Sequence, residues 1–414
     1  MRCFSILTVG LFAATWCGPS DAGDWPQWRG PLGIGVGSEK HVPLMWSKTE
    51  HVKWTVQLPE DGNSSPVVIG DKVLVTTPEN KGRVRSLLCL DRRDGKELWR
   101  KSVEYADREV MHNTNPHCSP SPATDGERVV VWYGSAGLYC YDLNGKELWQ
   151  KDLGKFDHIW GYGSSPVIHG DLVFLNAGPG TVAFVAAFNK HSGTEVWRKT
   201  YPQMASTKPE QYRGSWSTPV IVGEGNEALM LLSLPQTLWA VKPATGEEVW
   251  WCQGLGDLVY TSPLVDGEVV VAMGGFHGPA IACRMGGTGD VTATHRLWRH
   301  AEKNPQRIGS GVAVNGHVYI LNENGIVWCL DEQTGEKKWE HRLGGTSWGS
   351  MCHVDGRLYV QNMNGTVFVM AVDSTKFELL AENALNEGSR SSPAFSNGEV
   401  FVRTFRTVYC IAEK

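Results

Sequence analysis

The sequence predicts an all-β fold: an eight-bladed β-propeller of four-stranded antiparallel blades, in which an N-terminal strand completes the last blade. A Gly turn followed by a strand ending on Trp recurs along the chain, with successive copies between 41 residues (Trp298 to Trp339) and 53 residues (Trp197 to Trp250) apart. A second pattern, a Ser/Thr-Pro pair or its equivalent before an apolar run, begins eight times. A period of about 40–50 residues in a β-rich chain is typical of propeller blades.

The first pattern is interpreted as the turn and outer strand of each blade. Its copies read DRRDGKELW at 91–99 and DLNGKELW at 142–149. An outer-strand Trp can lay its ring over the Gly turn of the neighbouring blade, and burying such a ring is worth about 2–3 kcal/mol. We therefore assign a structural docking role, and no ligand, to the repeated tryptophans: Trp54, Trp99, Trp149, Trp197, Trp250, Trp298 and Trp339.

The second pattern is interpreted as the start of each blade. A Gly four or five residues after the Pro position places a tight turn between two β-branched runs, which indicates a hairpin. A third apolar strand follows before the Gly-Trp strand. The eight predicted starts are Ser65-Pro66, Ser121-Pro122, Ser165-Pro166, Thr218-Pro219, Ser262-Pro263, Gly311-Val312, Met351-Cys352 and Ser392-Pro393.

The two ends of the chain together supply the last blade. The eighth start is followed by only three strands before Lys414, and the strand at 51–56, around Trp54, has no blade of its own. Pairing these segments closes the ring and removes open sheet edges. Blade 7 lacks its Trp, because the segment 373–379 occupies that place. We therefore expect different packing between blades 7 and 8.

The N-terminus predicts export. Arg2, an apolar run from Phe4 to Trp16 and a small-residue site ending at Ala22 are typical of a cleaved signal peptide. We therefore expect a signal peptide at 1–22, a wrapped leader at 23–50 and a single propeller at 51–414. No later apolar run is long enough to span a bilayer. The mature protein is expected to be a monomer in the periplasm or outside the cell.

Charge and cysteine placement argue against a nucleic-acid-binding protein and against a disulfide-stabilised one. A formal net charge of -5 and a pI near 6.2, without a Lys/Arg run, argue against a nucleic-acid partner. Four cysteines share one repeat position, where blades 3 and 4 carry Ala187 and Ala240. A position that accepts Cys or Ala is a small buried slot. We therefore expect free core thiols rather than disulfides at Cys89, Cys140, Cys329 and Cys410.

The repeated Asp-x-x-(Thr/Asp)-Gly-(Lys/Glu)-x-x-Trp pattern resembles the tryptophan-docking motif of the pyrroloquinoline-quinone (PQQ) repeat propellers. That superfamily includes quinoprotein alcohol dehydrogenases and the non-enzymatic propeller of outer-membrane β-barrel assembly. The resemblance covers essentially residues 24–414, and WPQWRGP at 25–31 resembles the start of many exported PQQ-like proteins. It implies an eight-bladed fold, but a fold alone does not assign a function.

Propellers bind ligands at the axial mouth, where the first strand of each blade begins. Aromatic and arginine side chains in a funnel suit a flat anion or a peptide. The alternative is that these side chains only plug the channel. The candidate ligand-binding residues, each just before a blade start, are His112, Asn113, Asn115, His117, Trp160, Tyr162, Arg213, Trp216, Tyr260, Arg307, Trp348 and Arg390.

The chemistry that the resemblance implies for a dehydrogenase is missing from these segments. The quinoprotein dehydrogenases use a vicinal Cys-Cys disulfide, a Glu/Asn/Asp calcium set and an Asp base. This chain has no adjacent cysteines, and Asp257 is the nearest carboxylate to the predicted mouth. His112 and His117 have no third ligand in register for zinc. We therefore predict no catalytic residue, no metal and no cofactor.

Two hypotheses follow. The first is an exported, non-catalytic scaffold that binds an envelope or secreted protein, a peptide or a small ligand. The alternative is a divergent PQQ-dependent dehydrogenase, with calcium, that oxidises an alcohol or a sugar.

Overall fold

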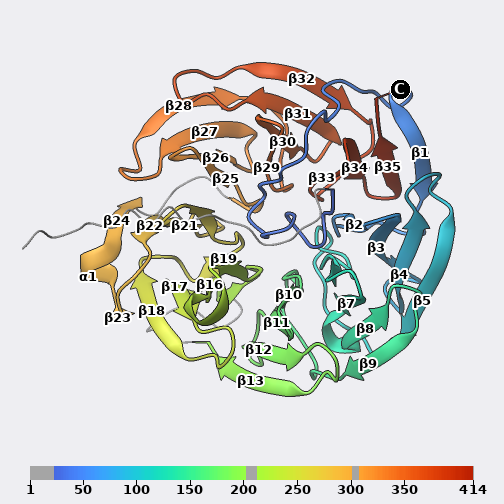
Figure 1. Cartoon of the computed structure of the whole chain (residues 1–414), viewed down its shortest axis with the longest axis horizontal. Coiled ribbons are helices and arrows are strands. Elements are labelled where there is room, and N and C mark those ends of the chain that lie inside the picture. Colours follow the sequence, from blue (N-terminus) through green and yellow to red (C-terminus); the bar gives the residue numbers. More distant parts are fainter. Residues whose placement is uncertain (1–22, 202–211, 301–306, 414) are drawn as a thin grey trace, which may run out of the picture.

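A computed structural model describes residues 23–201, 212–300 and 307–413, so the signal peptide predicted at 1–22 lies outside the described residues. Eight antiparallel sheets surround a central axis, as Figure 1 shows. The only α-helix in the described part of the chain is the short α1 (Thr292–His295). The predicted all-β, eight-bladed propeller is confirmed.

Blades 1 to 4 each run outward from the axis and each comprise four consecutive antiparallel strands. Blade 1 contains β2 (Val67–Ile69), β3 (Lys72–Glu79), β4 (Val84–Asp91) and β5 (Glu97–Glu104). Blade 2 contains β6 (Ala123–Thr124), β7 (Arg128–Trp132), β8 (Leu138–Asp142) and β9 (Glu147–Lys151). Blade 3 contains β10 (Val167–His169), β11 (Leu172–Ala177), β12 (Phe184–Asn189) and β13 (Glu195–Thr200). Blade 4 contains β15 (Val220–Val222), β16 (Leu229–Leu234), β17 (Thr237–Val241) and β18 (Glu248–Gln253).

Blades 5 to 8 repeat this arrangement, and blade 8 takes its outer strand from the N-terminus. Blade 5 contains β20 (Leu264–Asp266), β21 (Val269–Met273), β22 (Ala280–Arg284) and β24 (Arg296–His300). Blade 6 contains β25 (Val312–Val314), β26 (His317–Leu321), β27 (Ile326–Asp331) and β28 (Lys337–Arg342). Blade 7 contains β29 (Cys352–Val354), β30 (Arg357–Gln361), β31 (Thr366–Ala371) and β32 (Leu379–Ala384). Blade 8 contains β33 (Ala394–Ser396), β34 (Glu399–Arg403), β35 (Thr407–Ile411) and β1 (Val52–Gln57).

Three short strands lie outside the repeat. β14 (Gly214–Ser215) pairs in parallel with β19 (Leu258–Val259), which joins the loops that precede blades 4 and 5. β23 (Gly289–Asp290) pairs in parallel with β18 and adds a fifth strand to blade 4. The four-residue α1 follows β23 directly.

The repeated tryptophans join neighbouring blades as predicted, with one exception. Six indole N–H groups donate to a backbone carbonyl in the turn of the next blade, at 2.8–3.0 Å. The contact leaves no room for a side chain in that turn, because a Cβ on Gly193 would lie 2.7 Å from the Trp149 ring. The six are Trp54, Trp99, Trp149, Trp197, Trp298 and Trp339.

Trp250 is the exception. It is fully buried, but its Nε1 has no hydrogen-bond partner among the described residues. Blade 5 has no Gly-Trp turn for it to contact. The connection that contains β23 and α1 stands there instead, and Trp250 pairs with Gly289 of that connection. The seam between blades 4 and 5 is therefore held by burial rather than by the indole hydrogen bond.

Blade 7 packs against blade 8 without a Trp, as predicted. Ala381 stands opposite Val369, at the register position that Trp holds in the other blades. The turn that such a Trp would contact does not exist, because in blade 8 it is replaced by the two ends of the chain, joined from Ala412 N–H to His51 O at 2.9 Å. Phe377 is not the Trp equivalent, since it stacks on His341 of blade 6.

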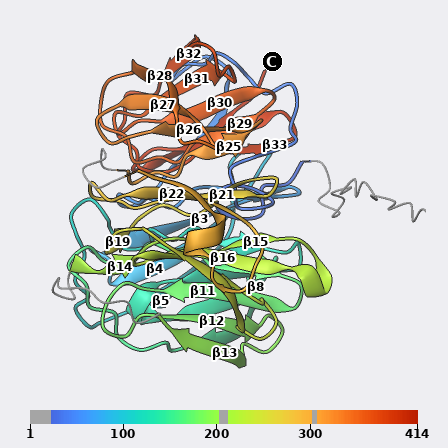
Figure 2. The ribbon, with the colours of Figure 1, turned by 90° about the vertical axis from the view of Figure 1, so that its left-hand side faces the viewer.

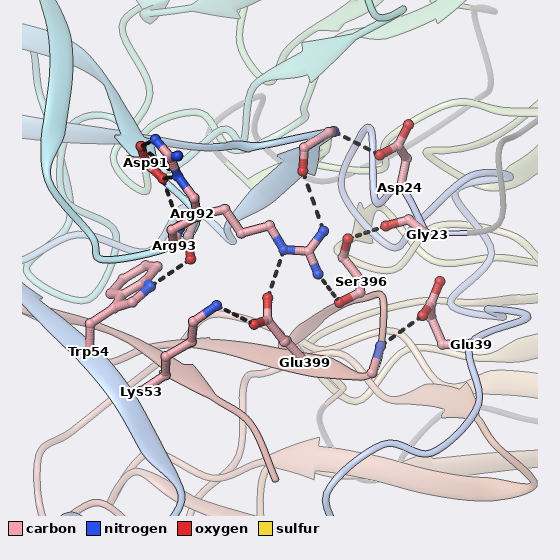
Figure 3. A network of polar contacts seen from close by, with 12 residues as sticks. Gly23, Asp24, Glu39, Lys53, Trp54, Asp91, Arg92, Arg93, Ser396 and Glu399 are labelled. Atoms are coloured by element: carbon pink, nitrogen blue, oxygen red, sulfur yellow. Dashed lines mark hydrogen bonds and ion pairs between the residues drawn. The ribbon is translucent and has the colours of Figure 1, made fainter. Parts of the chain in front are cut away.

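Ion pairs and the leader close the ring between blades 8 and 1, as Figure 3 shows. β1 pairs with β35, with Trp54 opposite Cys410. Glu399 lies 2.6 Å from Lys53 and 2.6 Å from Arg92, so one carboxylate joins the N-terminal strand, the C-terminal strands and the first turn. The side chain of Ser396 donates to the carbonyl of Gly23, which fastens the leader to the same seam.

The leader does more than wrap the propeller, because it crosses the axis and closes one end of the channel. Pro26 accepts a hydrogen bond from Thr124 of blade 2 at 2.8 Å, and Arg29 donates to the carbonyl of Gly311 at the start of blade 6, on the opposite side of the ring. Figure 2 shows the leader, in blue, on one face of the ring and the β14–β19 pair on the other. Any ligand cavity on the axis therefore opens on the β14–β19 face.

The core agrees with the predicted cysteine chemistry. All eight cysteines of the described residues are free and buried. Burial raises the pKa of Cys89 and of Cys140 to about 12, so both thiols stay protonated and unreactive at neutral pH. Within residues 23–201, 212–300 and 307–413, no helix is long and apolar enough to cross a membrane.

Candidate ligand-binding mouth

A cavity of about 480 Å³ lies on the axis, with Trp28 of the leader among its lining residues. This volume is within the range of about 300–1,000 Å³ that is usual for ligand pockets. The loops that precede the inner strands form its sides. Seven of the twelve predicted mouth residues line it: His112, Asn115, Trp160, Trp216, Tyr260, Trp348 and Arg390.

One side of the cavity is an aromatic wall, formed by Trp160, Trp216 and Tyr260. The Trp216 ring lies 6.1 Å from that of Trp160 and 4.8 Å from that of Tyr260. Its indole N–H donates to Gly161 O at 2.9 Å, which fixes the ring against the loop before blade 3. The parallel pairing of β14 with β19 sets the spacing of Trp216 and Tyr260, because each follows one of these strands.

Three exposed apolar side chains adjoin the aromatic wall, in the chain or in space, and are called the apolar rim: Ile159, which precedes Trp160, Tyr212 and Phe276. These side chains are 43%, 41% and 56% exposed. Tyr212 lies 6.0 Å from Trp160, and Phe276 lines the cavity beside the wall. Exposed apolar groups that continue into a buried aromatic pocket are typical of a protein-binding surface.

The opposite side of the cavity is polar. Arg390 lies over the rings of Trp348 and Phe405, at 5.4 and 4.7 Å, and burial lowers its pKa. Trp348 donates its indole N–H to Glu323 at 3.1 Å, so the only carboxylate that lines the cavity already has a partner. Asn115 donates to the carbonyl groups of Trp160 and Tyr162, at 2.7 and 2.9 Å, and thus holds the loop that precedes blade 3.

The cavity contains a feature that sequence reasoning missed: a closed belt of eight hydroxyls around the axis. In each blade one belt residue donates its backbone N–H to the side-chain oxygen of the next, at 2.8–3.0 Å, and the last donates to the first. The belt residues are Ser65, Ser121, Ser165, Thr218, Ser262, Ser310, Ser350 and Ser392.

The sequence pointed to part of this belt without revealing its geometry. Six belt residues are the Ser or Thr of a predicted blade start. In blades 6 and 7 the belt position is Ser310 and Ser350, one residue before the predicted starts at Gly311 and Met351. No proline follows there to mark the position.

Five predicted mouth residues do not line the cavity. Tyr162 is buried and accepts a hydrogen bond from Arg85 at 3.3 Å, while His117 contacts Glu109 at 3.2 Å. Arg85 and Glu109 themselves form a buried ion pair at 2.8 Å. These groups pack the interface of blades 1 to 3. The other three absent from the lining are Asn113, Arg213 and Arg307.

Arg307 differs most from its predicted role. It is fully buried over Trp328, with 5.4 Å between the guanidinium carbon and the ring centre. Burial lowers its pKa to about 10. In the described part of the chain its guanidinium has no hydrogen-bond partner. It belongs to the interior of the ring rather than to a ligand site.

The residues present do not fit a calcium-bound quinone. Calcium takes six to eight oxygen ligands, several of them carboxylates. Glu323 alone among the acidic residues lines the cavity, and the described residues contain no group of three His, Cys, Asp or Glu side chains that could hold a metal. His112 binds Thr114, 2.7 Å from its Nδ1, rather than a second histidine.

Comparison with known proteins identifies the family. A family model described as Outer membrane protein assembly factor BamB, a PQQ-type repeat model, matches residues 36–184, 183–281 and 287–404. The chain belongs to this family. These matches span nearly the whole described propeller, so the PQQ-like repeat inferred from the Gly-Trp motif is confirmed.

The individual relatives include an outer membrane protein assembly factor and a quinone-dependent dehydrogenase. The BamB of Moranella endobia is 22% identical over 349 residues, which cover 82% of this chain and 72% of the relative. A 1-butanol dehydrogenase (quinone) of Thauera butanivorans is 25% identical over 210 residues, 45% of this chain, and the match spans only 32% of the enzyme. A europium-containing methanol dehydrogenase superposes with a TM-score of 0.69 at 11% identity, covering 95% and 98% of the two chains. At that identity the likeness shows the fold alone.

Proposed function

We propose that the protein is an exported, non-catalytic interaction scaffold of the cell envelope, and that its mouth takes up a short segment of a partner protein. The observation that carries this proposal is the continuity between the aromatic wall and the apolar rim. A projecting side chain could fill the cavity beside Trp216 while its neighbours cover Ile159 and Phe276. Buried aromatic anchors surrounded by such contacts supply most of the affinity in protein interfaces.

The family match supports a protein partner, since the BamB relative is named as an assembly factor of outer membrane proteins. The low carboxylate content of the cavity supports a binding role over a redox one. Glu323 accepts a hydrogen bond from Trp348, and His112 contacts the Thr114 hydroxyl through Nδ1. We propose a monomer that acts by binding.

The first experiment measures retention of envelope proteins on the immobilised mature chain. Replacing both Ile159 and Phe276 by Ser removes two of the three rim side chains without touching a buried side chain. The matched control is Val196→Ser, because Val196 is 48% exposed on the outer strand of blade 3. We expect one partner to be retained by the wild type and the control and lost by the rim variant. Equal retention by all three proteins would contradict binding at the mouth.

A second experiment tests the dehydrogenase alternative directly. The purified chain is incubated with PQQ and Ca²⁺ and assayed with an electron-accepting dye on alcohols and sugars. The proposal predicts no saturable change in absorbance and no turnover. Saturable cofactor binding with turnover would replace the scaffold by an enzyme.

A further inference from the structure

The hydroxyl belt carries unused hydrogen-bond donors. Each side-chain oxygen accepts a backbone N–H from the neighbouring blade, which leaves its own O–H free to donate. None of the eight hydroxyls donates to an acceptor in the described residues, and each belt residue is at most 4% exposed. Buried hydroxyls normally have an acceptor, and leaving one unmet costs about 1–3 kcal/mol.

These donors face the mouth cavity. Six of the eight belt residues line it, together with Trp28 of the leader, while Ser262 and Ser310 do not. The unmet O–H groups therefore converge on the same space that the aromatic wall encloses. A ligand group that reaches this part of the cavity meets hydroxyls that can donate and a Trp ring.

Two buried arginines add positive charge next to the belt. Arg29 donates to the carbonyl of Gly311, which follows belt residue Ser310, and its Nε and Nη1 have no partner in the described residues. Arg403 donates to the carbonyl of Thr76 at 2.7 Å and to both oxygens of Ser64, which precedes belt residue Ser65, while its Nε and Nη2 are likewise unpaired. Both side chains are at most 1% exposed.

No described carboxylate forms an ion pair with either arginine. A buried guanidinium without a counter-charge is unfavourable, and a nearby anion lowers that cost. The surroundings of the belt thus combine converging O–H donors with buried positive charge that is only partly offset, by Asp61 and Glu387 beyond ion-pair distance of Arg403. This combination favours an anion over a cation.

We propose that the belt end of the mouth cavity binds an oxyanion, held by neighbouring hydroxyls of the belt in the field of Arg29 and Arg403. The oxyanion is either a free inorganic ion or the carboxylate of a bound peptide. The site is formed by the belt, the leader and Arg403 of β34, so it does not depend on binding of a protein at the apolar rim.

The test uses Thr218, because its hydroxyl can be removed without a change of shape. Thr218→Val deletes the donor together with the acceptor of the Ser165 N–H, and Thr218→Ser keeps both, as in seven of the eight blades. Each purified protein is titrated with sodium sulfate, and separately with acetyl-trialanine and its C-terminal amide, at constant ionic strength. Intrinsic Trp fluorescence, which includes Trp28, reports binding.

We expect saturable binding that is about tenfold weaker in Thr218→Val, since one hydrogen bond to a charged group is lost, and nearly unchanged in Thr218→Ser. Binding of sulfate alone identifies a free ion, whereas tighter binding of the peptide acid than of its amide identifies a carboxylate. Absence of saturation in the wild type, or equal affinity in all three proteins, overturns the proposal. If Thr218→Val does not fold, the pair Ser392→Ala and Ser392→Thr replaces it.

Discussion

Replacing Gly246 by Ala tests how the repeated tryptophans hold neighbouring blades together. Gly246 has a φ of +68°, and a Cβ there would lie 2.7 Å from Cδ2 of Trp197. Trp197 is 8% exposed and donates its indole N–H to Pro243 O at 2.8 Å. The substitution therefore strains the turn and pushes the indole away from the carbonyl that it contacts.

The expected loss of stability is the sum of three contributions. The left-handed backbone costs about 1 kcal/mol with a Cβ, the steric overlap about 1–2 kcal/mol, and the weakened hydrogen bond about 1 kcal/mol. Gly246→Ala should therefore lower the free energy of unfolding by about 3–4 kcal/mol. The matched control is Gly356→Ala, because Gly356 has a φ of +70° but no atom within 4 Å of an added Cβ. The control should cost only the backbone contribution, about 1 kcal/mol.

Urea unfolding, followed by Trp fluorescence, measures Gly246→Ala, Gly356→Ala, Trp197→Ala and the double variant Trp197→Ala/Gly246→Ala. Trp197→Ala and Gly246→Ala remove the same contact, so the double variant should lose less stability than the sum of the two single losses. Equal losses for Gly246→Ala and Gly356→Ala would refute the docking interpretation, since the only cost would then be that of the turn.

Three further predictions concern buried ionisable groups. Burial and the charge of Asp266 raise the pKa of Glu332 to about 7. Its folded pKa thus exceeds its unfolded one, so the folded state binds the proton more tightly and stability falls as pH rises from about 4.5 through 7. Glu332→Gln should remove this fall and raise the free energy of unfolding at pH 8 by about 1–2 kcal/mol, with little effect at pH 4. Urea titrations at both pH values measure this, and an unchanged pH profile would show that Glu332 does not titrate in this range. Glu109→Gln leaves Arg85 buried without its counter-charge and should cost about 3 kcal/mol, partly recovered by adding Arg85→Met; a neutral single substitution would mean that the pair contributes nothing. The eight buried cysteines should be inert to a thiol reagent in the folded protein and all reactive in denaturant, and fewer than eight reactive thiols would indicate a disulfide.

The fold was predictable because its main contacts repeat in the sequence. A Gly turn and a Trp at fixed spacing identify the outer strand, and the same pattern at Trp54 revealed the strand exchange that closes the ring. Two departures from the repeat could not be read from the sequence. Trp250 has the expected motif but lacks its carbonyl partner, because blade 5 has no Gly-Trp turn to supply one. Likewise, Phe377 lies near the expected place, yet Ala381 holds the Trp register.

The candidate site was only partly predictable, because it depends on contacts between distant segments. Position before an inner strand placed Trp160, Trp216 and Tyr260 at the mouth. The same rule could not separate Tyr162, which turns inward to Arg85. The hydroxyl belt needs the closed ring to exist, since Ser392 donates to Ser65 across the whole sequence at 2.9 Å. The placement of Trp28 in the cavity also depends on a leader that crosses the axis.

The central claim is that the mouth, and not the blade edges, binds a partner in the envelope. A photo-crosslinking amino acid in place of Phe276, introduced in living cells, tests it most directly. The same residue in place of Val196 serves as the reference on the outer edge. We predict one discrete crosslinked protein from position 276 and none from position 196, identified by mass spectrometry. The same crosslinked proteins from both positions, or crosslinks from position 196 alone, would contradict the claim.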